Sequence, residues 1–543
     1  MKKLVSLLLV LALCLTSMSA LAELTEPGTL PITTEPATLT IWAAPSVGQD
    51  DYDVCKMTKW IEERTGITLN WIQVSNVETT TLFNNSIAST DWPDIYFVGV
   101  SGPQATQFAA DGVLLPLTDL IEEHGYFLKQ AFEKYPHVKE EITSPDGNIY
   151  AFPTMRYTYS GSAVNKLWVY EEWLNRYMEE TGNPSPETPE ELKEMLVFFR
   201  DNDMNGNGDT TDEIIMTGNY NYGTEGGASQ YYILNAFCFI PSFPFQFFYV
   251  GDDNHITTDV TSDGYREGLR FVNDLYKEGL FSEEIFVQDL NTMRSLTSTT
   301  KDKVIVATAG APYSPRLLTP QTIDNAVTYY DYVPLQPLKN KDGVAVYPTR
   351  PDEVVGMRNF ITTSCKNPEL AVRFLDFIYS DEFQAYLTYG GEEGVDWEWV
   401  DSPSFDGDPK SVRSLVSSEQ KLKDLWDGNW GGALFNTREM LMSMEAATSD
   451  QRASWAAHNL YMANSKLTGV PTLVWCDDED LSTEFTEAKT LLTKYIENAM
   501  SEFILGIRDI DSDADWNAYI DQLEKMGLAD FLTLSDRYYS LAD

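Results

Sequence analysis

The chain of 543 residues carries 83 Asp and Glu against 38 Lys and Arg, which gives a formal net charge of −45. Such an acidic protein repels nucleic acids and anionic membrane surfaces, which excludes both as principal partners, and its charge disfavours polyanionic ligands. The length exceeds what one hydrophobic core normally organises, so we expect two or more domains.

The N-terminus has the pattern of a secretory signal peptide. Residues 1–3 include two lysines, an apolar run follows at Leu4–Leu15, and residues 20–22 form a small–x–small cleavage site. The run is too short to cross a membrane as a helix, so we expect residues 1–22 to direct export and to be removed. Lipid attachment at Cys14 is the less favoured alternative, because Leu13 stands where a small residue is usual.

The cysteines after this leader are widely spaced and form no CxxC pair, which argues against a zinc site. They are Cys55, Cys238, Cys365 and Cys476. An exported protein can form disulfides, and the spacing leaves open whether these residues pair or remain buried free thiols.

Residues 23–38 are rich in proline and threonine and predict a short linker or mobile N-terminus. Strand and helix patterns then alternate as in an open α/β sheet. The predicted strands are residues 39–43, 67–74 and 95–98, and the predicted helices are residues 56–65, ended by Gly66, and residues 79–89. Open sheets of this kind bind ligands at the carboxyl ends of their strands.

A turn and a short strand at Ser144–Pro153 predict the crossing into a second lobe, where tryptophan and tyrosine become more frequent. Thr188 is placed to cap a helix, with Pro189 at its first position and Glu191 completing a capping box. Further helices are predicted at 230–238, 265–279, 367–380, 516–528 and 531–539, and further strands at 304–307, 333–338 and 360–364.

The strongest local signal is the acidic loop at residues 201–214, which reads DNDMNGNGDTTDEI. Alternating oxygen-bearing side chains with glycines let one short loop wrap a hard cation such as Ca²⁺. One possible register starts at Asp201 and supplies Asp203, Asn205, Gly206, Asp209 and Asp212. A second register starts at Asp203 and continues through Asn205, Asn207 and the carbonyl of Asp209 to Asp212 and Glu213. The alternative is an acidic solvated turn, because Asn, Asp and Gly dominate turns.

Stretches over nearly the whole chain carry a family resemblance through their order and spacing. They are KWIEERTGITLNW, STDWPDIYFVG, DGVLLPLTDLI, SPDGNIYAFP, TPEELKEML followed by NDMNGNGDTTDEI, YVPLQPLKNKDG, CKNPELAVRFLDFIYSDE, GGEEGVDWEW, and SEFILG followed by YIDQLEKMGLADFL and RYY. In these stretches the chain resembles the extracellular solute-binding proteins of ABC transporters, in particular the carbohydrate-binding branch common in Gram-positive bacteria.

The resemblance implies an α/β, two-lobed periplasmic-binding-protein-like fold (type II) with a ligand cleft. Each lobe would be an α/β sheet with helices on both faces, and the C-terminus would be rich in helices. We therefore expect a discontinuous N-terminal lobe, residues 39–152 and 300–388, and a discontinuous C-terminal lobe, residues 153–299 and 389–543.

The family often carries a structural calcium loop of the form D-x-N-x-N-G followed by D-E. This favours the register with Asp203, Asn205, Asn207, Asp209, Asp212 and Glu213. The chain departs from the family in two respects: it has one more residue than usual between the glycine and the Asp-Glu pair, and it lacks the clear lipobox of many relatives.

Sugars present apolar C–H faces, which aromatic rings cover, and hydroxyls, which a few polar side chains satisfy. The chain has 13 Trp and 29 Tyr. The residues that we expect to contact a ligand are Trp92, Arg156, Tyr157, Trp397, Trp399, Trp426 and Trp430. For each of these, packing within a core is the alternative. We assign the remaining tryptophans considered, Trp60, Trp168, Trp173, Trp455 and Trp516, to the core.

An enzyme is not expected, because the chain contains no HExxH, GxSxG or P-loop motif and its four histidines lack metal-ligand spacing. The resemblance implies the substrate-binding component of an ABC importer. Such a protein would be a monomer that captures a carbohydrate, expected to be a neutral oligosaccharide, closes around it and delivers it to membrane permease subunits. An oligopeptide-binding transport protein is the nearer alternative, and a secreted glycan-active enzyme is the more distant one.

Overall fold

A computed structural model describes residues 23–45, 51–75, 78–157, 162–219, 227–242, 245–319, 323–351, 353–416, 435–446 and 452–541. The expected signal peptide with Cys14, and the candidate ligand residues Trp426 and Trp430, lie outside these residues. The chain divides into two compact units. Unit 1 comprises Met1–Met155, Val355–Glu398 and Ser414–Met440, and unit 2 comprises Arg156–Val354, Trp399–Arg413 and Leu441–Asp543.

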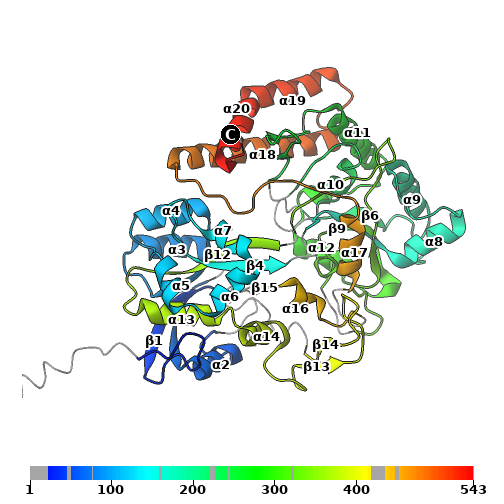
Figure 1. Cartoon of the computed structure of the whole chain (residues 1–543). Helices are drawn as coiled ribbons and strands as arrows, with labels where there is room; N and C mark the ends of the chain where they lie inside the picture. The colour runs from blue at the N-terminus through cyan, green and yellow to red at the C-terminus, as the bar shows by residue number, and fades with distance from the viewer. Residues whose placement is uncertain are drawn as a thin grey trace, which may run out of the picture. The chain divides into compact units, whose positions relative to one another are not determined.

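The centre of unit 1 is a six-stranded sheet with the strand order β15-β4-β12-β3-β1-β2 (Figure 1). Its strands are β1 (Ala37–Ala43), β2 (Ile67–Gln73), β3 (Ile95–Val100), β4 (Phe152–Tyr157), β12 (Glu353–Ile361) and β15 (Phe435–Asn436). Strand β1 runs parallel to β2 and to β3, whereas β12 runs antiparallel to β3. The chain therefore forms β2 on one side of β1 and then β3 on the other side. The carboxyl ends of β1 and β3 are the switch point of this sheet.

The helices of unit 1 are α2 (Lys56–Thr65), α3 (Thr79–Ala88), α4 (Gly102–Ala110), α5 (Thr118–His124), α6 (Phe127–Lys134), α7 (Pro136–Ile142), α13 (Pro368–Phe377) and α14 (Asp381–Tyr389). The alternation of strand and helix predicted for the first hundred residues is confirmed. Aromatic side chains form part of the core between helix and sheet: Phe83 of α3 lies 5.8 Å from Trp42, and Tyr96 stacks on Phe360 at 5.1 Å.

Residues 23–36 are held against unit 1 and are not a loose linker. The guanidinium of Arg373 on α13 donates to the carbonyl oxygens of Thr25 and Glu26 at 2.6 and 3.0 Å. The buried residues Ile32 and Thr33 donate their N–H groups to the carbonyl of Thr65. The prediction of a mobile segment is therefore wrong, because a distant arginine and the end of α2 bind this proline-rich stretch through its backbone.

Unit 2 contains a four-stranded sheet with the order β10-β5-β9-β6. Its strands are β5 (Lys166–Tyr170), β6 (Ile214–Thr217), β9 (Val306–Ala311) and β10 (Tyr332–Pro334). Strand β9 is buried along its whole length and pairs antiparallel with β5 and parallel with β6.

These pairings correct the expected lobe boundaries. Residues 300–354 belong to unit 2, where the sequence had placed them in the N-terminal lobe, because β9 and β10 complete the sheet of unit 2. Residues 389–398 and 414–440 belong to unit 1, where the sequence had placed them in the C-terminal lobe. Strand β15, just beyond residue 434, adds to the sheet of unit 1.

The other short strands pair in twos: β7 (Tyr249–Val250) with β8 (Ile256–Thr257), β11 (Tyr347–Thr349) with β16 (Ser465–Leu467), and β13 (Trp397–Val400) with β14 (Ser411–Ser414). The remaining helices are α8 (Glu171–Thr181), α9 (Pro189–Asp201), α10 (Ser229–Leu234), α11 (Asp263–Lys277), α12 (Leu290–Thr297), α16 (Arg438–Met442), α17 (Arg452–Met462), α18 (Glu479–Ile504), α19 (Asp513–Lys525) and α20 (Leu528–Tyr539). Short 3₁₀ turns lie at Glu283–Phe286, Lys301–Lys303 and Ser314–Arg316.

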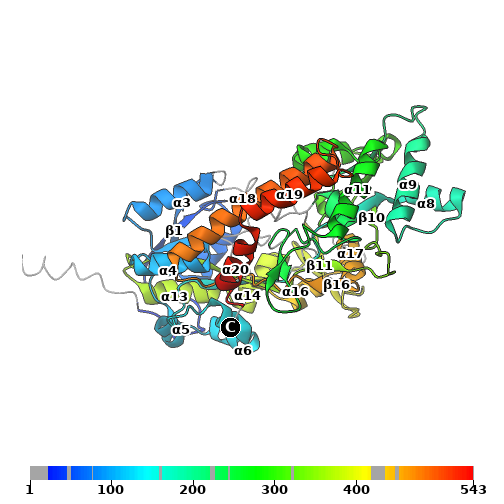
Figure 2. The ribbon, with the colours of Figure 1, turned by 90° about the horizontal axis from the view of Figure 1, so that it is seen from above.

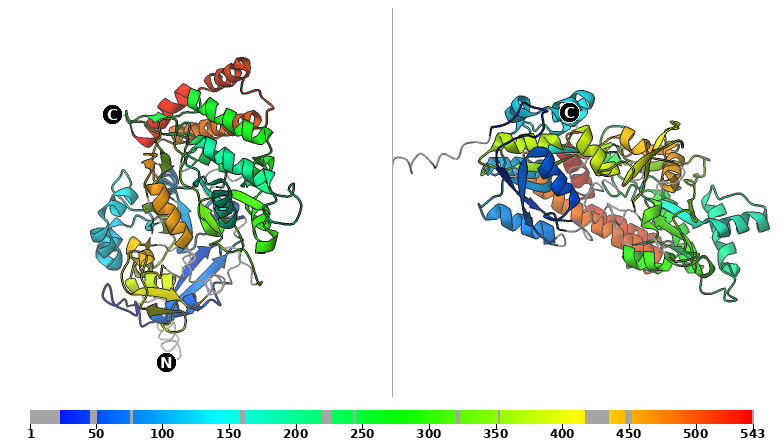
Figure 3. Two further views of the ribbon diagram at one scale, coloured as in Figure 1. Left: turned by 90° about the vertical axis from the view of Figure 1, so that its right-hand side faces the viewer. Right: turned by 90° about the horizontal axis from the view of Figure 1, so that it is seen from below.

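Helices α11, α18 and α20 pack together in unit 2, and α11 and α18 lie side by side in Figures 2 and 3. Asn273 of α11 is buried and donates its side-chain amide to the carbonyls of Phe503 and Ile504, which belong to the last turn of α18. A helix leaves its last carbonyls without intrahelical partners, so this side chain caps α18 from outside. Within the described residues, none of the helices is both long enough and apolar enough to cross a bilayer.

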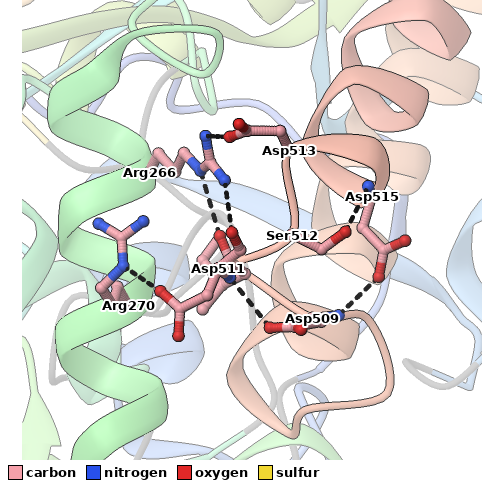
Figure 4. A network of polar contacts seen from close by, with 8 residues as sticks. Arg266, Arg270, Asp509, Asp511, Ser512, Asp513 and Asp515 are labelled. Carbon is pink, nitrogen blue, oxygen red and sulfur yellow. Dashed lines mark hydrogen bonds and ion pairs between the residues drawn. The ribbon is translucent and has the colours of Figure 1, made fainter.

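Residues 509–515, which read DIDSDAD, span the end of the α18–α19 connection and the first turn of α19, and they carry alternating aspartates. The Arg266 guanidinium of α11 donates to the carboxylate of Asp513 at 2.7 Å and to the carbonyls of Ile510 and Asp511 (Figure 4). Arg270, one turn further along α11, donates to the carboxylate of Asp511 at 2.6 Å. Two arginines thus pair with two of the four carboxylates in this acidic stretch.

Candidate ligand-binding and metal sites

The acidic loop after α9 is organised around Asp203. Its Oδ1 accepts the N–H groups of Gly206 and Asn207 at 2.7 and 3.1 Å, and its Oδ2 accepts the N–H of Gly208 at 2.8 Å. Gly206 and Gly208 have φ angles of 74° and 90°, which only glycine adopts readily. Asp201, by contrast, is the last residue of α9 and points to Arg200, with a separation of 2.7 Å. Asp203, and not Asp201, therefore organises the backbone turns of this loop.

The end of the loop contains carboxylate oxygens without partners. Asp212 Oδ2 accepts the amides of Asn205 and Asn207 at 3.3 and 2.7 Å, and Glu213 Oε1 accepts the N–H of Met204 at 2.9 Å. The other oxygens of the two residues, Asp212 Oδ1 and Glu213 Oε2, are buried and have no hydrogen-bond partner in the part of the chain that the structure describes. Burial raises the pKa of the Glu213 carboxyl, and the neighbouring charge of Asp212 adds to this rise.

These oxygens fit a hard cation. Buried carboxylates are stable when they are paired or bind a metal, and Ca²⁺ prefers carboxylate, amide and carbonyl oxygens. The Asp209 carboxylate is exposed and accepts the hydroxyl of Thr211 at 2.6 Å, a contact that lowers its pKa, so its carbonyl is the group available to an ion. No group of three or more His, Cys, Asp and Glu side chains within the described residues is arranged to hold a metal. A cation here would therefore need amide and carbonyl ligands as well.

In the described part of unit 1, the expected ligand residues are Trp92 and Trp397, and both are half-buried. The indole N–H of Trp92 donates to the carbonyl of Ile87 at 2.9 Å, which fixes the ring beside the end of α3. Trp397 lies 5.8 Å from the ring of Tyr389. Each ring has one face or edge in contact with protein and part of its surface exposed.

In unit 2, the expected ligand residues differ in exposure. Tyr157 is buried and packs against Met442, which corresponds to the core alternative for this residue. Arg156 is exposed and lies near the half-buried Arg350, and burial together with the charge of Arg156 lowers the pKa of Arg350 to about 10. Trp399 is 53% exposed, which is unusual for a tryptophan.

Two cavities lie within single units. One in unit 1, of about 550 Å³, is lined by α6, the start of α14 and residues 435–440. One in unit 2, of about 400 Å³, is lined by α8 together with Met204, Lys301 and Asp331. Neither cavity contains any of the residues that the sequence proposed as ligand contacts.

The tryptophans assigned to the core are buried at Trp168, Trp173 and Trp516, which confirms the prediction for these three, whereas Trp60 and Trp455 are half-buried. Cys55, Cys238, Cys365 and Cys476 are free thiols. Sequence reasoning overlooked Arg358, a charged residue in the strand EVVGMRNFI, whose only sequence signal was its position among apolar neighbours.

The comparisons with known proteins agree on one kind of protein over most of the chain. The family described as "Bacterial extracellular solute-binding protein" matches residues 53–385. A relative from Streptococcus pneumoniae serotype 4, described as the fructooligosaccharide ABC transporter substrate-binding protein FusA, is 25% identical over 533 residues, which are 95% of this chain and 92% of that protein.

Among solved structures, FusA from S. pneumoniae in complex with kestose has a TM-score of 0.74 at 22% identity, with 93% of this chain and 99% of that chain covered. A FusA EF-hand mutant in complex with fructo-nystose has a TM-score of 0.73 at the same identity and coverage. An HMO-binding, ABC-transporter-associated solute-binding protein from Bifidobacterium longum infantis has a TM-score of 0.72 at 17% identity, with the same coverage. These likenesses confirm the expected two-lobed α/β fold.

Proposed function

The chain belongs to the family of bacterial extracellular solute-binding proteins, and from this premise we propose that it is the substrate-binding component of an ABC importer for a carbohydrate. The observation that carries the proposal is the likeness to FusA over nearly the full length of both chains. FusA is described as binding fructooligosaccharides, and a second relative with the same fold as binding HMO. We therefore propose a neutral oligosaccharide as the ligand, and no covalent chemistry.

We propose the location, the oligomeric state and the partners of the protein from the same family membership. Residues 1–22 direct export, and the mature protein works as a monomer at the cell surface, where it passes its ligand to the permease subunits of the importer. The proposed ligand contacts are Trp92, Arg156, Tyr157, Trp397, Trp399, Trp426 and Trp430. Trp399 leads this set because an exposed indole offers a sugar an apolar face without any rearrangement of a core.

We also propose that the loop Asp203–Glu213 binds a structural Ca²⁺ through Asp203, Asn205, Asn207, the carbonyl of Asp209, Asp212 and Glu213. The support is the pair of buried, unpartnered oxygens on Asp212 and Glu213, together with the EF-hand named for a FusA structure. When bound, the ion supplies positive charge that offsets the clustered carboxylates. The start and the end of the loop are joined by the N–H of Met204, which donates to Glu213, and by the amides of Asn205 and Asn207, which donate to Asp212.

A thermal-shift screen tests the proposed function. Thermal melts of the exported protein are recorded with kestose, nystose, raffinose, maltotriose, 2′-fucosyllactose and a pentapeptide. Each saccharide is then analysed for breakdown. A ligand present at about 100 times its Kd stabilises the folded state by about 2.7 kcal/mol. We expect at least one oligosaccharide to raise Tm and to be recovered intact. Stabilisation by the peptide alone, or release of saccharide fragments, would overturn the proposal.

A further inference from the structure

The side chain of Arg358 lies at the edge of the unit 1 sheet where ligands of open α/β sheets bind. Arg358 on β12 pairs with Gly99, the last residue but one of β3. In the parallel register of β1 and β3, Ala43 at the end of β1 is level with Phe97, so Gly99 extends past the end of β1. Arg358 is therefore placed at the carboxyl ends of β1 and β3, which is the switch point of the sheet.

The guanidinium of Arg358 is poorly compensated. Arg358 as a whole is half-buried, but its Nε is buried and has no hydrogen-bond partner among the described residues. No carboxylate of the described residues forms an ion pair with it, and burial lowers its pKa. The nearby Tyr52, which stacks on Trp71 at 4.4 Å, favours the charged form of Arg358 electrostatically, but by less than burial disfavours it. A charge that is buried without a partner costs free energy, so it is retained where something else supplies the partner.

The backbone beside Arg358 is distorted in a way that is typical of functional edges. The register of β12 against β3 shifts between Arg358 and Phe360. The residue between them, Asn359, has a φ of 60°, and its buried Oδ1 also lacks a hydrogen-bond partner. Bulges of this kind redirect a side chain next to a binding site, and backbone strain tends to persist where function requires it.

The strand surface beside the guanidinium is open. Gly99 is exposed, and a Cβ atom at this position would lie 3.9 Å from Nη1 of Arg358. A glycine inside a strand often marks a place where a ligand approaches the backbone. The stacked rings of Tyr52 and Trp71 stand on the same edge, since Tyr52 donates its N–H to the side chain of Gln73, the last residue of β2.

From these observations we infer that Arg358 is a ligand-binding residue, whose guanidinium donates hydrogen bonds to oxygen atoms of the captured carbohydrate. The inference rests on the proposed function and adds a specific contact to it. Hydroxyl oxygens of a neutral sugar and carboxylate oxygens of an acidic sugar share this acceptor chemistry, and the planar fork of arginine suits both.

The test combines calorimetric titration with thermal melts for the wild type, Arg358→Met, Arg358→Lys and Arg64→Met. The probes are the neutral saccharides of the screen and trigalacturonate. Arg64 is the matched control, because it is an exposed arginine of the same unit in an ion pair with Glu382 at 2.9 Å. We expect Arg358→Met to weaken binding roughly tenfold or more. Its ligand-free Tm should stay equal or rise, because an unpaired buried charge is removed.

The outcomes separate this inference from the proposed function. Arg64→Met should leave affinity unchanged, and Arg358→Lys should bind with intermediate affinity because it keeps the charge and loses the fork. A larger loss for trigalacturonate than for the neutral saccharides identifies a carboxylate as the acceptor, and the reverse identifies hydroxyls. If the wild type binds a saccharide and either Arg358 variant binds it equally well, the inference fails alone. If the wild type binds no saccharide, the proposed function and the inference fail together.

Discussion

The imidazole Nδ1 of His255 lies 2.8 Å from Oδ2 of Asp536, and this contact joins the β7–β8 hairpin to the C-terminal helix α20. Asp536 Oδ1 also accepts the N–H of Ile256 at 2.6 Å, and Asn254 donates to the carbonyl of Leu541. The Asp536 carboxylate is buried while the imidazole is exposed. The hydrogen bond to Asp536, reinforced by its charge, raises the pKa of His255 above its ordinary value of 6.5.

This contact predicts a pH-dependent stability of unit 2. A histidine whose pKa is raised by folding contributes stability that is fully present below about pH 6.5 and is lost as the pH rises through the folded pKa. His255→Gln should therefore lower Tm at about pH 5.5, and its difference from the wild type should shrink towards about pH 9. Thermal melts across this range measure the effect, with His124→Gln of α5 as the control. A difference that grows with pH would contradict the assignment.

Removal of calcium should destabilise the protein and leave its choice of sugar unchanged. Ca²⁺ at about 100 times its Kd adds about 2.7 kcal/mol to the free energy of unfolding, so EDTA should lower Tm. Asp212→Asn should reduce this calcium-dependent shift, because it removes one of the charges that an ion would compensate. Melts with added EDTA, calcium and saccharide measure both properties.

The matched control for Asp212→Asn is Asp513→Asn in the second acidic loop. Asp513 is paired with Arg266 and is not a proposed ion ligand, so the calcium-dependent shift should survive its replacement. Two results would refute the placement of the ion: a Tm that does not respond to EDTA, or a change in which sugar binds when calcium is added.

Replacement of Trp399 should weaken sugar binding without loss of stability. The side chain is 53% exposed, so Trp399→Ala should change the free energy of unfolding by less than about 0.5 kcal/mol. Loss of a stacking face worth about 1 kcal/mol corresponds to roughly fivefold weaker binding. Titration with the best saccharide of the screen measures the affinity, and Leu491→Ala, at an exposed position of α18, is the control. Unchanged affinity would remove Trp399 from the ligand contacts.

Alanine substitutions at two glycines test how firmly residues 23–36 are held against unit 1. Gly66 and Gly279 have nearly equal φ angles, 75° and 73°, but a Cβ at Gly66 would lie 2.2 Å from the carbonyl oxygen of Thr33, whereas nothing lies within 4 Å at Gly279. Alanine at Gly279 should cost about 1–2 kcal/mol from its left-handed backbone alone. Alanine at Gly66 should cost about 1–3 kcal/mol more because of the clash. Equal Tm losses would show that the N-terminal segment yields easily.

Short-range patterns were predicted well where a few neighbouring residues decide the structure. The capping box of Thr188 and Glu191 is present at the start of α9, and the predicted elements between residues 39 and 98 are confirmed. The helix expected at 367–380 is present as α13 and ends earlier, at Phe377, and the Ser380 hydroxyl accepts the N–H of Phe383 to cap the next helix, α14. Asn367, which precedes α13, forms no side-chain capping hydrogen bond. At these positions more than one residue could begin or end a helix, and packing decides which residue does so.

The alternation of elements, the family resemblance and the oxygen-bearing residues of the loop Asp203–Glu213 could be read from the sequence, because these depend on residue types at short spacing. The fold was needed to show which sheet receives β9, how Arg373 holds the N-terminal segment, and that Arg266 and Arg270 pair with Asp513 and Asp511. It also decided that the Nε of Arg358 is left without a partner. Strand pairing and the partners of charges join residues far apart in the chain, and their free energy depends on burial and distance, which local sequence patterns do not contain.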